Sequence, residues 1–95
     1  MMMKGLQMPT ISMFFGILIR MYVGDSEHNP PHFHALYQEF DAIVDIATCE
    51  ILKGDFPKKQ AKLVTAWAEL HQDELLADWE LAQRGETPFR IEPLK

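Results

Sequence analysis

Apolar residues follow two different patterns in the two halves of this 95-residue chain. Residues 11–23 are almost uniformly apolar, with β-branched and aromatic side chains in the middle, which is typical of a strand buried on both faces. Residues 32–38 and 42–46 alternate between the two faces of a strand, and residues 51–53 form a fourth short run. The short connections between these segments predict an antiparallel meander of three or four strands.

A helix is predicted from Pro57 to Arg84. Six positions in this segment step by three and four residues, which is the spacing of one helical face: Val64, Ala68, His71, Leu75, Trp79 and Ala82. A straight helix of this length would extend about 42 Å, whereas a domain of this size has a radius of gyration of roughly 13 Å. We therefore expect a break near residues 71–73, giving a C-terminal helical pair or one kinked helix, and an α+β fold overall.

The domain is expected to comprise residues 8–95. Residues 1–7 contain three methionines and no periodicity, and we interpret them as a disordered N-terminal extension. Residues 87–95 are expected to be extended. Three apolar side chains in this tail are available to attach it to the core: Phe89, Ile91 and Leu94.

Charge and cysteine content narrow the class of protein. The net charge of −5 argues against non-specific nucleic-acid binding by the domain as a whole. A single cysteine, Cys49, excludes an internal disulfide and a multi-cysteine zinc site within one chain. Residues 13–23 are about half the length of a membrane helix, and the N-terminus lacks a signal-peptide pattern. These features predict a cytoplasmic protein with no membrane segment.

Basic residues are unevenly distributed. Four lysines gather around the predicted start of the helix: Lys53, Lys58, Lys59 and Lys62. They fit either a solvated first turn or a small patch that contacts phosphate groups, as in RNA.

The segment from Asp25 to His34 is the strongest candidate for chemistry. Three of the four histidines fall within seven residues, beside Pro30-Pro31. Histidine titrates near neutral pH and is the commonest metal ligand. Because side chains alternate along a strand, His32 and His34 are expected on one face and Phe33 on the other.

Four interpretations of this segment remain open. In the first, His32 and His34 are structural and bond to loop carbonyls. In the second, His28, His32 and His34 bind a divalent metal, with Asp25 or His71 as a further ligand.

The third interpretation is metal-free acid–base chemistry on a phosphodiester, with RNA as the substrate. His32 and His34 would act as general base and acid, and Arg20 would stabilise the phosphate charge. In the fourth, the segment recognises a partner protein through Phe33 and Tyr37, because aromatic residues dominate interface hot spots.

Several segments also carry a family resemblance. They are Met8 to Tyr22, His28-Asn-Pro-Pro-His-Phe-His34, Trp67-Ala-Glu-Leu-His71 with Glu74-Leu-Leu and Trp79, and Ile91-Glu-Pro-Leu94. On these residues the chain resembles the bacterial family called domain of unknown function 4160, over nearly its whole length from Met8. It departs from the family pattern by carrying Ser26-Glu27 between Asp25 and His28.

The resemblance implies a partner and no established reaction. In similar proteins the gene often neighbours one for another small domain, numbered 2442, and such pairs are suspected toxin–antitoxin or regulatory modules. We therefore expect a component of a two-gene regulatory or toxin–antitoxin-like module that acts by protein association with a small protein encoded nearby. The alternative is a small hydrolase or ribonuclease that uses His28, His32 and His34, with or without a metal.

Overall fold

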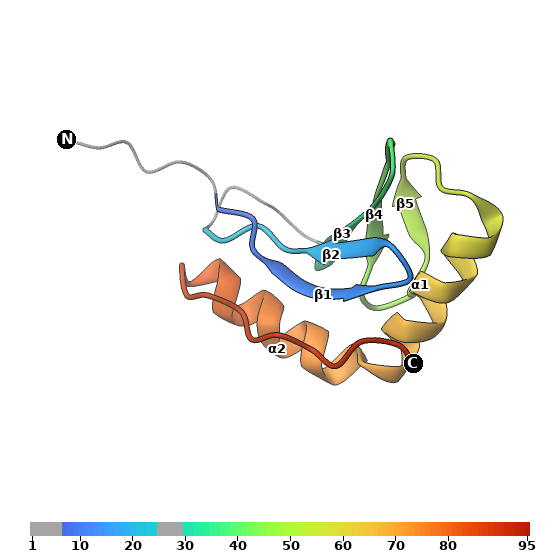
Figure 1. Cartoon of the computed structure of the whole chain (residues 1–95). Coiled ribbons are helices and arrows are strands. Elements are labelled where there is room, and N and C mark those ends of the chain that lie inside the picture. The colour runs from blue at the N-terminus through green and yellow to red at the C-terminus, as the bar shows by residue number, and fades with distance from the viewer. Residues whose placement is uncertain (1–6, 25–29) are drawn as a thin grey trace.

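The computed structural model describes residues 7–24 and 30–95, which form a five-stranded antiparallel sheet followed by two helices (Figure 1). The strands are β1 (Thr10–Phe14), β2 (Ile17–Arg20), β3 (His32–Tyr37), β4 (Phe40–Asp45) and β5 (Ile51–Lys53), and the helices are α1 (Lys58–Leu70) and α2 (Gln72–Gln83). Each strand pairs with the next along the chain. The predicted α+β fold, with an antiparallel meander and a C-terminal helical pair, is confirmed, and it has five strands where three or four were predicted.

The additional strand comes from residues 11–23, which were predicted as one strand and instead contain the β1–β2 hairpin. Phe14 pairs with Ile17, so Phe15 and Gly16 form the whole loop. Both residues have positive φ, 50° and 78°, which is the backbone of the tight turn that suits twisted antiparallel strands. Glycine adopts this conformation at little cost, and it is the local signal for the turn. The prediction was wrong because apolar neighbours on both sides concealed that signal.

The hydrophobic core lies between one face of the sheet and the two helices. Phe33, Val44 and Ile19 point to this face and are fully buried. Trp67 of α1 packs on the same face, with its ring centroid 5.8 Å from that of Phe33 and 5.3 Å from that of Phe14. In Figure 1, α2 lies beneath β1 and β2. The opposite side of the sheet, to which the alternate residues of each strand point, is called the open face below.

Helix α2 runs across one end of the sheet. The predicted break falls at His71, which ends α1 and precedes α2. Just after it, Gln72 Nε2 donates to the carbonyl of Ile46 at 2.8 Å, next to the end of β4. At the far end of α2, the amide of Gly24 donates to the carbonyl of Ala82 at 2.7 Å, beyond the end of β2. The helix therefore covers the end of the sheet where β2 finishes and β3 begins.

The C-terminal segment, residues 86–95, returns alongside α2 without regular secondary structure (Figure 1). The amide of Ile91 donates to the carbonyl of Ile11 at 2.7 Å, and Ser12 Oγ donates to the carbonyl of Ile91 at 2.9 Å. One residue further, the carbonyl of Glu92 accepts the indole N–H of Trp67 at 2.8 Å. These bonds attach the tail to both β1 and α1.

Side chains in the tail differ from the prediction at one position. Ile91 is buried and Leu94 is partly buried against the core, as predicted. Phe89 is 73% exposed, so its predicted role as an apolar anchor was wrong. The tail is attached there by its backbone instead, because the amide of Phe89 donates to Asp78 Oδ1 at 2.9 Å.

The predicted extension, residues 1–7, lies outside the described residues except for Gln7, whose carbonyl accepts the amide of Val23 at 2.8 Å. Among the helices that the structure describes, none is both long enough and apolar enough to span a bilayer.

Candidate functional site

A row of residues in register crosses the open face of the sheet. Thr10 pairs with Arg20, Arg20 with His34, His34 with Ile43 and Ile43 with Lys53. Paired residues of neighbouring antiparallel strands project to the same side. The predicted catalytic residues Arg20 and His34 are therefore direct cross-strand neighbours.

The two histidines of β3 belong to a line of four aromatic rings, here called the ring row: Tyr22, His34, His32 and Trp79. The His34 ring lies edge-on to Tyr22, with centroids 4.8 Å apart, and its centroid is 5.4 Å from that of His32. The His32 ring is 5.1 Å from that of Trp79 in α2. Both histidines are 8% exposed. The predicted sharing of one face by His32 and His34 agrees with this contact between their rings.

One ring nitrogen of His32 has a structural role. Its Nδ1 lies 2.8 Å from the carbonyl of Pro30, which can only accept, so Nδ1 carries the hydrogen. The bond ties the start of β3 to the preceding Pro-Pro segment. This is the geometry that the structural interpretation of the histidines describes.

Beside His34, the open face contains a hollow of about 310 Å³. Its lining comes from five separate segments of the chain: Met8, Tyr22, His34, Asp41, Ile43, Lys53 and Gly54. Gly54 sits directly on β4, since a Cβ there would lie 2.2 Å from the carbonyl oxygen of Asp41. Arg20 does not line the hollow, and its Nε donates to Thr10 Oγ1 of β1 at 3.3 Å.

The predicted metal site finds no support within the described residues. His28 and Asp25 lie outside them, and no group of three or more His, Cys, Asp or Glu in residues 7–24 and 30–95 is arranged to hold a metal ion. Asp45, the cross-strand partner of His32, already accepts the amide of Ala47 at 2.7 Å through Oδ1.

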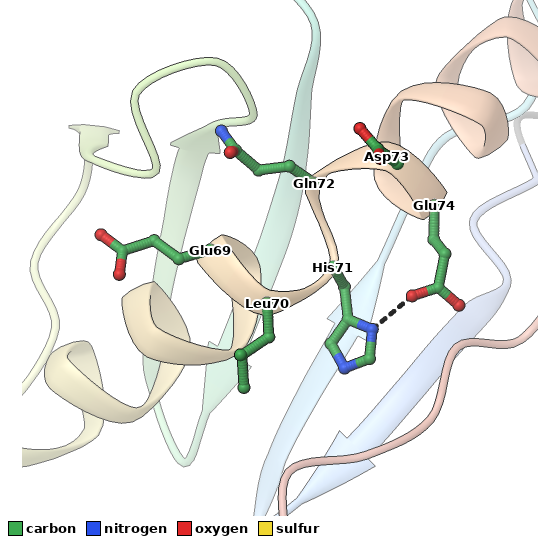
Figure 2. A pocket seen from close by; sticks show the side chains of 6 residues that line it. All are labelled: Glu69, Leu70, His71, Gln72, Asp73 and Glu74. Carbon is green, nitrogen blue, oxygen red and sulfur yellow. Dashed lines mark hydrogen bonds and ion pairs between the residues drawn. The ribbon is translucent and has the colours of Figure 1, made fainter.

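His71 belongs to a different part of the surface. Figure 2 shows its ring directed at Glu74, to which Nδ1 is hydrogen-bonded, in a hollow at the break between α1 and α2. Its other neighbour is Trp67, with ring centroids 5.4 Å apart. His71 therefore lies at the break between α1 and α2. Its ring contacts Glu74 and Trp67 and does not belong to the ring row.

The two predicted partner-binding residues, Phe33 and Tyr37, point to the face of the sheet that carries the core. Phe33 is fully buried against Trp67, so the prediction that it contacts a partner was wrong. Its strand face is the one that the helices cover, which alternation alone does not determine. Tyr37 shares this face and is half-buried, with its ring 6.3 Å from that of Phe56.

Burial raises the pKa of two groups, Cys49 and Asp78, and neither lines the hollow. Burial raises the pKa of the Cys49 thiol, and the carboxylates of Glu69 and Asp45 raise it further. Such a thiol is not activated as a nucleophile. Burial also raises the pKa of Asp78, the amide of Phe89 opposes that shift, and Glu74 adds to it.

Of the residues that line the hollow, sequence reasoning identified only His34 and Lys53 as candidates, and it missed the apolar part of the open face. Tyr22, Asp41 and Lys53 have no shared local motif and meet only through strand register. The apolar residues Met13, Leu18 and Leu36 pair across β1, β2 and β3 on the open face. Met13 and Leu18 were assigned to one strand buried on both faces, so their place on the open face was not predicted.

Comparison with known proteins places most of these elements in one family. A family model described as a domain of unknown function (DUF4160) matches residues 16–80, more than half of the chain. This confirms the resemblance carried by the histidine segment and the α1–α2 region. No curated protein and no solved structure matches the chain significantly.

Proposed function

We propose, from the premise that the chain belongs to the domain of unknown function 4160 family, that it is one component of a two-gene regulatory or toxin–antitoxin-like module in the cytoplasm. It acts by binding a small protein encoded nearby, through the open face of the sheet. The observation that carries this proposal is Phe15, an exposed aromatic residue in a backbone conformation that disfavours it.

Phe15 gains little from the folded monomer. It is 60% exposed and has a φ of 50°. Residues other than glycine, and bulky ones above all, rarely adopt this region of backbone conformation. In a two-residue hairpin loop whose second residue is glycine, asparagine is the favoured first residue. A residue that breaks a local rule without a compensating contact in the monomer points to a functional role.

The surface next to Phe15 is apolar as well. Met13 is 57% exposed, and it pairs with Leu18, which in turn pairs with Leu36. An antiparallel sheet commonly has one solvated face with polar side chains. A row of large apolar side chains on such a face is typical of a protein–protein contact. Phe15 would form the aromatic anchor at the end of this row.

The test uses co-expression with the product of the adjacent gene and measures copurification. Phe15→Asn combined with Met13→Gln should reduce copurification strongly while leaving the melting temperature unchanged or higher, because Asn-Gly suits the turn. Leu70→Gln is the matched control, since Leu70 is 70% exposed on α1 and away from the sheet. Retained copurification by the double variant, or equal loss by the control, would refute the open face as the docking surface.

A second candidate function is a small hydrolase or ribonuclease. It is favoured by the direct pairing of Arg20 with His34, and by the ring of Tyr22 placed against His34. An imidazole, a phenol and a guanidinium supply the groups needed for proton transfer and for stabilising charge on a phosphodiester. Cleavage of the dinucleotide uridylyl-adenosine by the intact chain is the measurement that tests it.

A further inference from the structure

We infer that the hollow on the open face binds a nucleoside phosphate, with the phosphate between Lys53 and His34. Three polar groups from three elements line this hollow: the phenol of Tyr22, the imidazole of His34 and the ammonium of Lys53. Its volume of about 310 Å³ lies at the lower end of the range for small-molecule sites, roughly 300–1,000 Å³.

The local charge favours an anion. The chain carries a net charge of −5, yet the row across the open face contains Arg20 and Lys53. Neither of these cations forms an ion pair with a carboxylate in the part of the chain that the structure describes. Arg20 is instead oriented by its Nε bond to Thr10. This bond holds Arg20 toward β1, so Lys53 is the cation that lines the hollow.

The remaining lining residues favour a nucleoside over phosphate alone. Met8 and the ring of Tyr22 provide apolar surface beside the polar groups, on which a base can lie. Asp41 contributes a carboxylate, which repels additional phosphate but accepts hydrogen bonds from ribose hydroxyls or base amino groups. A ligand that carries a phosphate, hydrogen-bond donors and a flat apolar ring matches these groups, and a nucleoside monophosphate has all three.

The site is built on rigid parts of the fold. His34 and Ile43 lie within paired strands, and Lys53 is held beside Ile43 by the β4–β5 ladder. Gly54 allows the chain after β5 to approach the backbone of Asp41 closely. The site therefore depends on the register of β3, β4 and β5, and ligand binding there does not require cleavage of the ligand.

The test is calorimetric titration of the intact chain with adenosine 5′-monophosphate, adenosine and inorganic phosphate, with the histidine ring signals followed by NMR. The monophosphate should bind more tightly than either fragment and should shift the His34 ring. Lys53→Gln should weaken its binding about tenfold, the value of one charge-assisted hydrogen bond. Lys58→Gln, which changes an exposed lysine outside the hollow, should leave binding unchanged.

Two results would overturn the inference. One is the absence of saturable binding of the monophosphate at millimolar concentration. The other is equal weakening by Lys53→Gln and Lys58→Gln, which would indicate general charge attraction. In parallel samples, cleavage of the dinucleotide uridylyl-adenosine would support the hydrolase as the second candidate function. Binding of the monophosphate without cleavage of the dinucleotide would refute that candidate and retain the site.

Discussion

Replacement of Trp67 by phenylalanine tests the packing of the core and the attachment of the tail together. Trp67 is fully buried, lies 5.3 Å from the ring of Phe14, and donates its indole N–H to the carbonyl of Glu92 at 2.8 Å. Trp67→Phe removes that hydrogen bond, which contributes about 1 kcal/mol. It also leaves a void where the second indole ring was, which costs about 1–3 kcal/mol.

The expected loss of unfolding free energy is therefore about 2–4 kcal/mol, out of about 5–14 kcal/mol for a domain of this length. For such a domain this corresponds to a melting temperature lower by about 10–25 °C. Urea unfolding can be followed by circular dichroism and by the fluorescence of the remaining tryptophan, Trp79, which is buried. Leu70→Ala is the control, because an exposed residue one turn away should change stability by less than about 0.5 kcal/mol.

The tail provides a second readout of the same variant. Without the indole N–H, the segment around Glu92 should open more often, so trypsin should cleave after Arg90 faster than in the native chain. A stability loss below about 1 kcal/mol, with unchanged cleavage at Arg90, would show that Trp67 neither fills the core nor retains the tail.

Two further substitutions test other contacts. Gly54→Ala places a Cβ 2.2 Å from the carbonyl oxygen of Asp41 at a φ of 94°, so it should destabilise the fold by more than about 3 kcal/mol. The control is Gly85→Ala, which has a similar φ and nothing within 4 Å of the added Cβ, and it should cost only about 1 kcal/mol. Equal decreases in melting temperature for the two variants would contradict the close approach of Gly54 to β4. The raised pKa of Asp78 means that the folded state holds this proton more tightly, so the stability that Asp78 contributes is present in acid and is lost as pH rises through its folded pKa. The melting temperature of Asp78→Asn relative to the native chain should therefore increase between pH 3.5 and 7, and a constant or decreasing difference would contradict burial as the cause.

Local periodicity predicted the elements that depend on local geometry. The alternation in β3 placed Phe33 on one face of the strand and His32 and His34 on the other. The burial of Phe33 in the core and the contact between the two imidazole rings agree with this prediction. The helix break at His71 followed from comparing helix length with domain size, and the radius of gyration is 12.7 Å.

What the sequence did not predict depends on tertiary contacts. Alternation divides a strand into two faces but does not say which face the helices cover, so Phe33 was assigned to the surface. The hollow gathers Tyr22, Asp41 and Lys53 from distant segments, and only the register of four strands brings them together. Phe15 was hidden for a different reason, since a phenylalanine in a tight turn contradicts the turn propensity on which sequence interpretation relies.

The attachment of the tail to β1 has a consequence for biosynthesis. The outer carbonyls of β1 are met by Ile91 and Arg90, whereas the opposite edge strand, β5, is only three residues long. Short edge strands resist pairing with other chains, but an uncovered apolar strand such as β1 is a template for aggregation. The edge of β1 is therefore covered by residues that are synthesised after both helices, and a copy that terminates before Arg90 would leave the ribosome with this edge open to pairing with other chains.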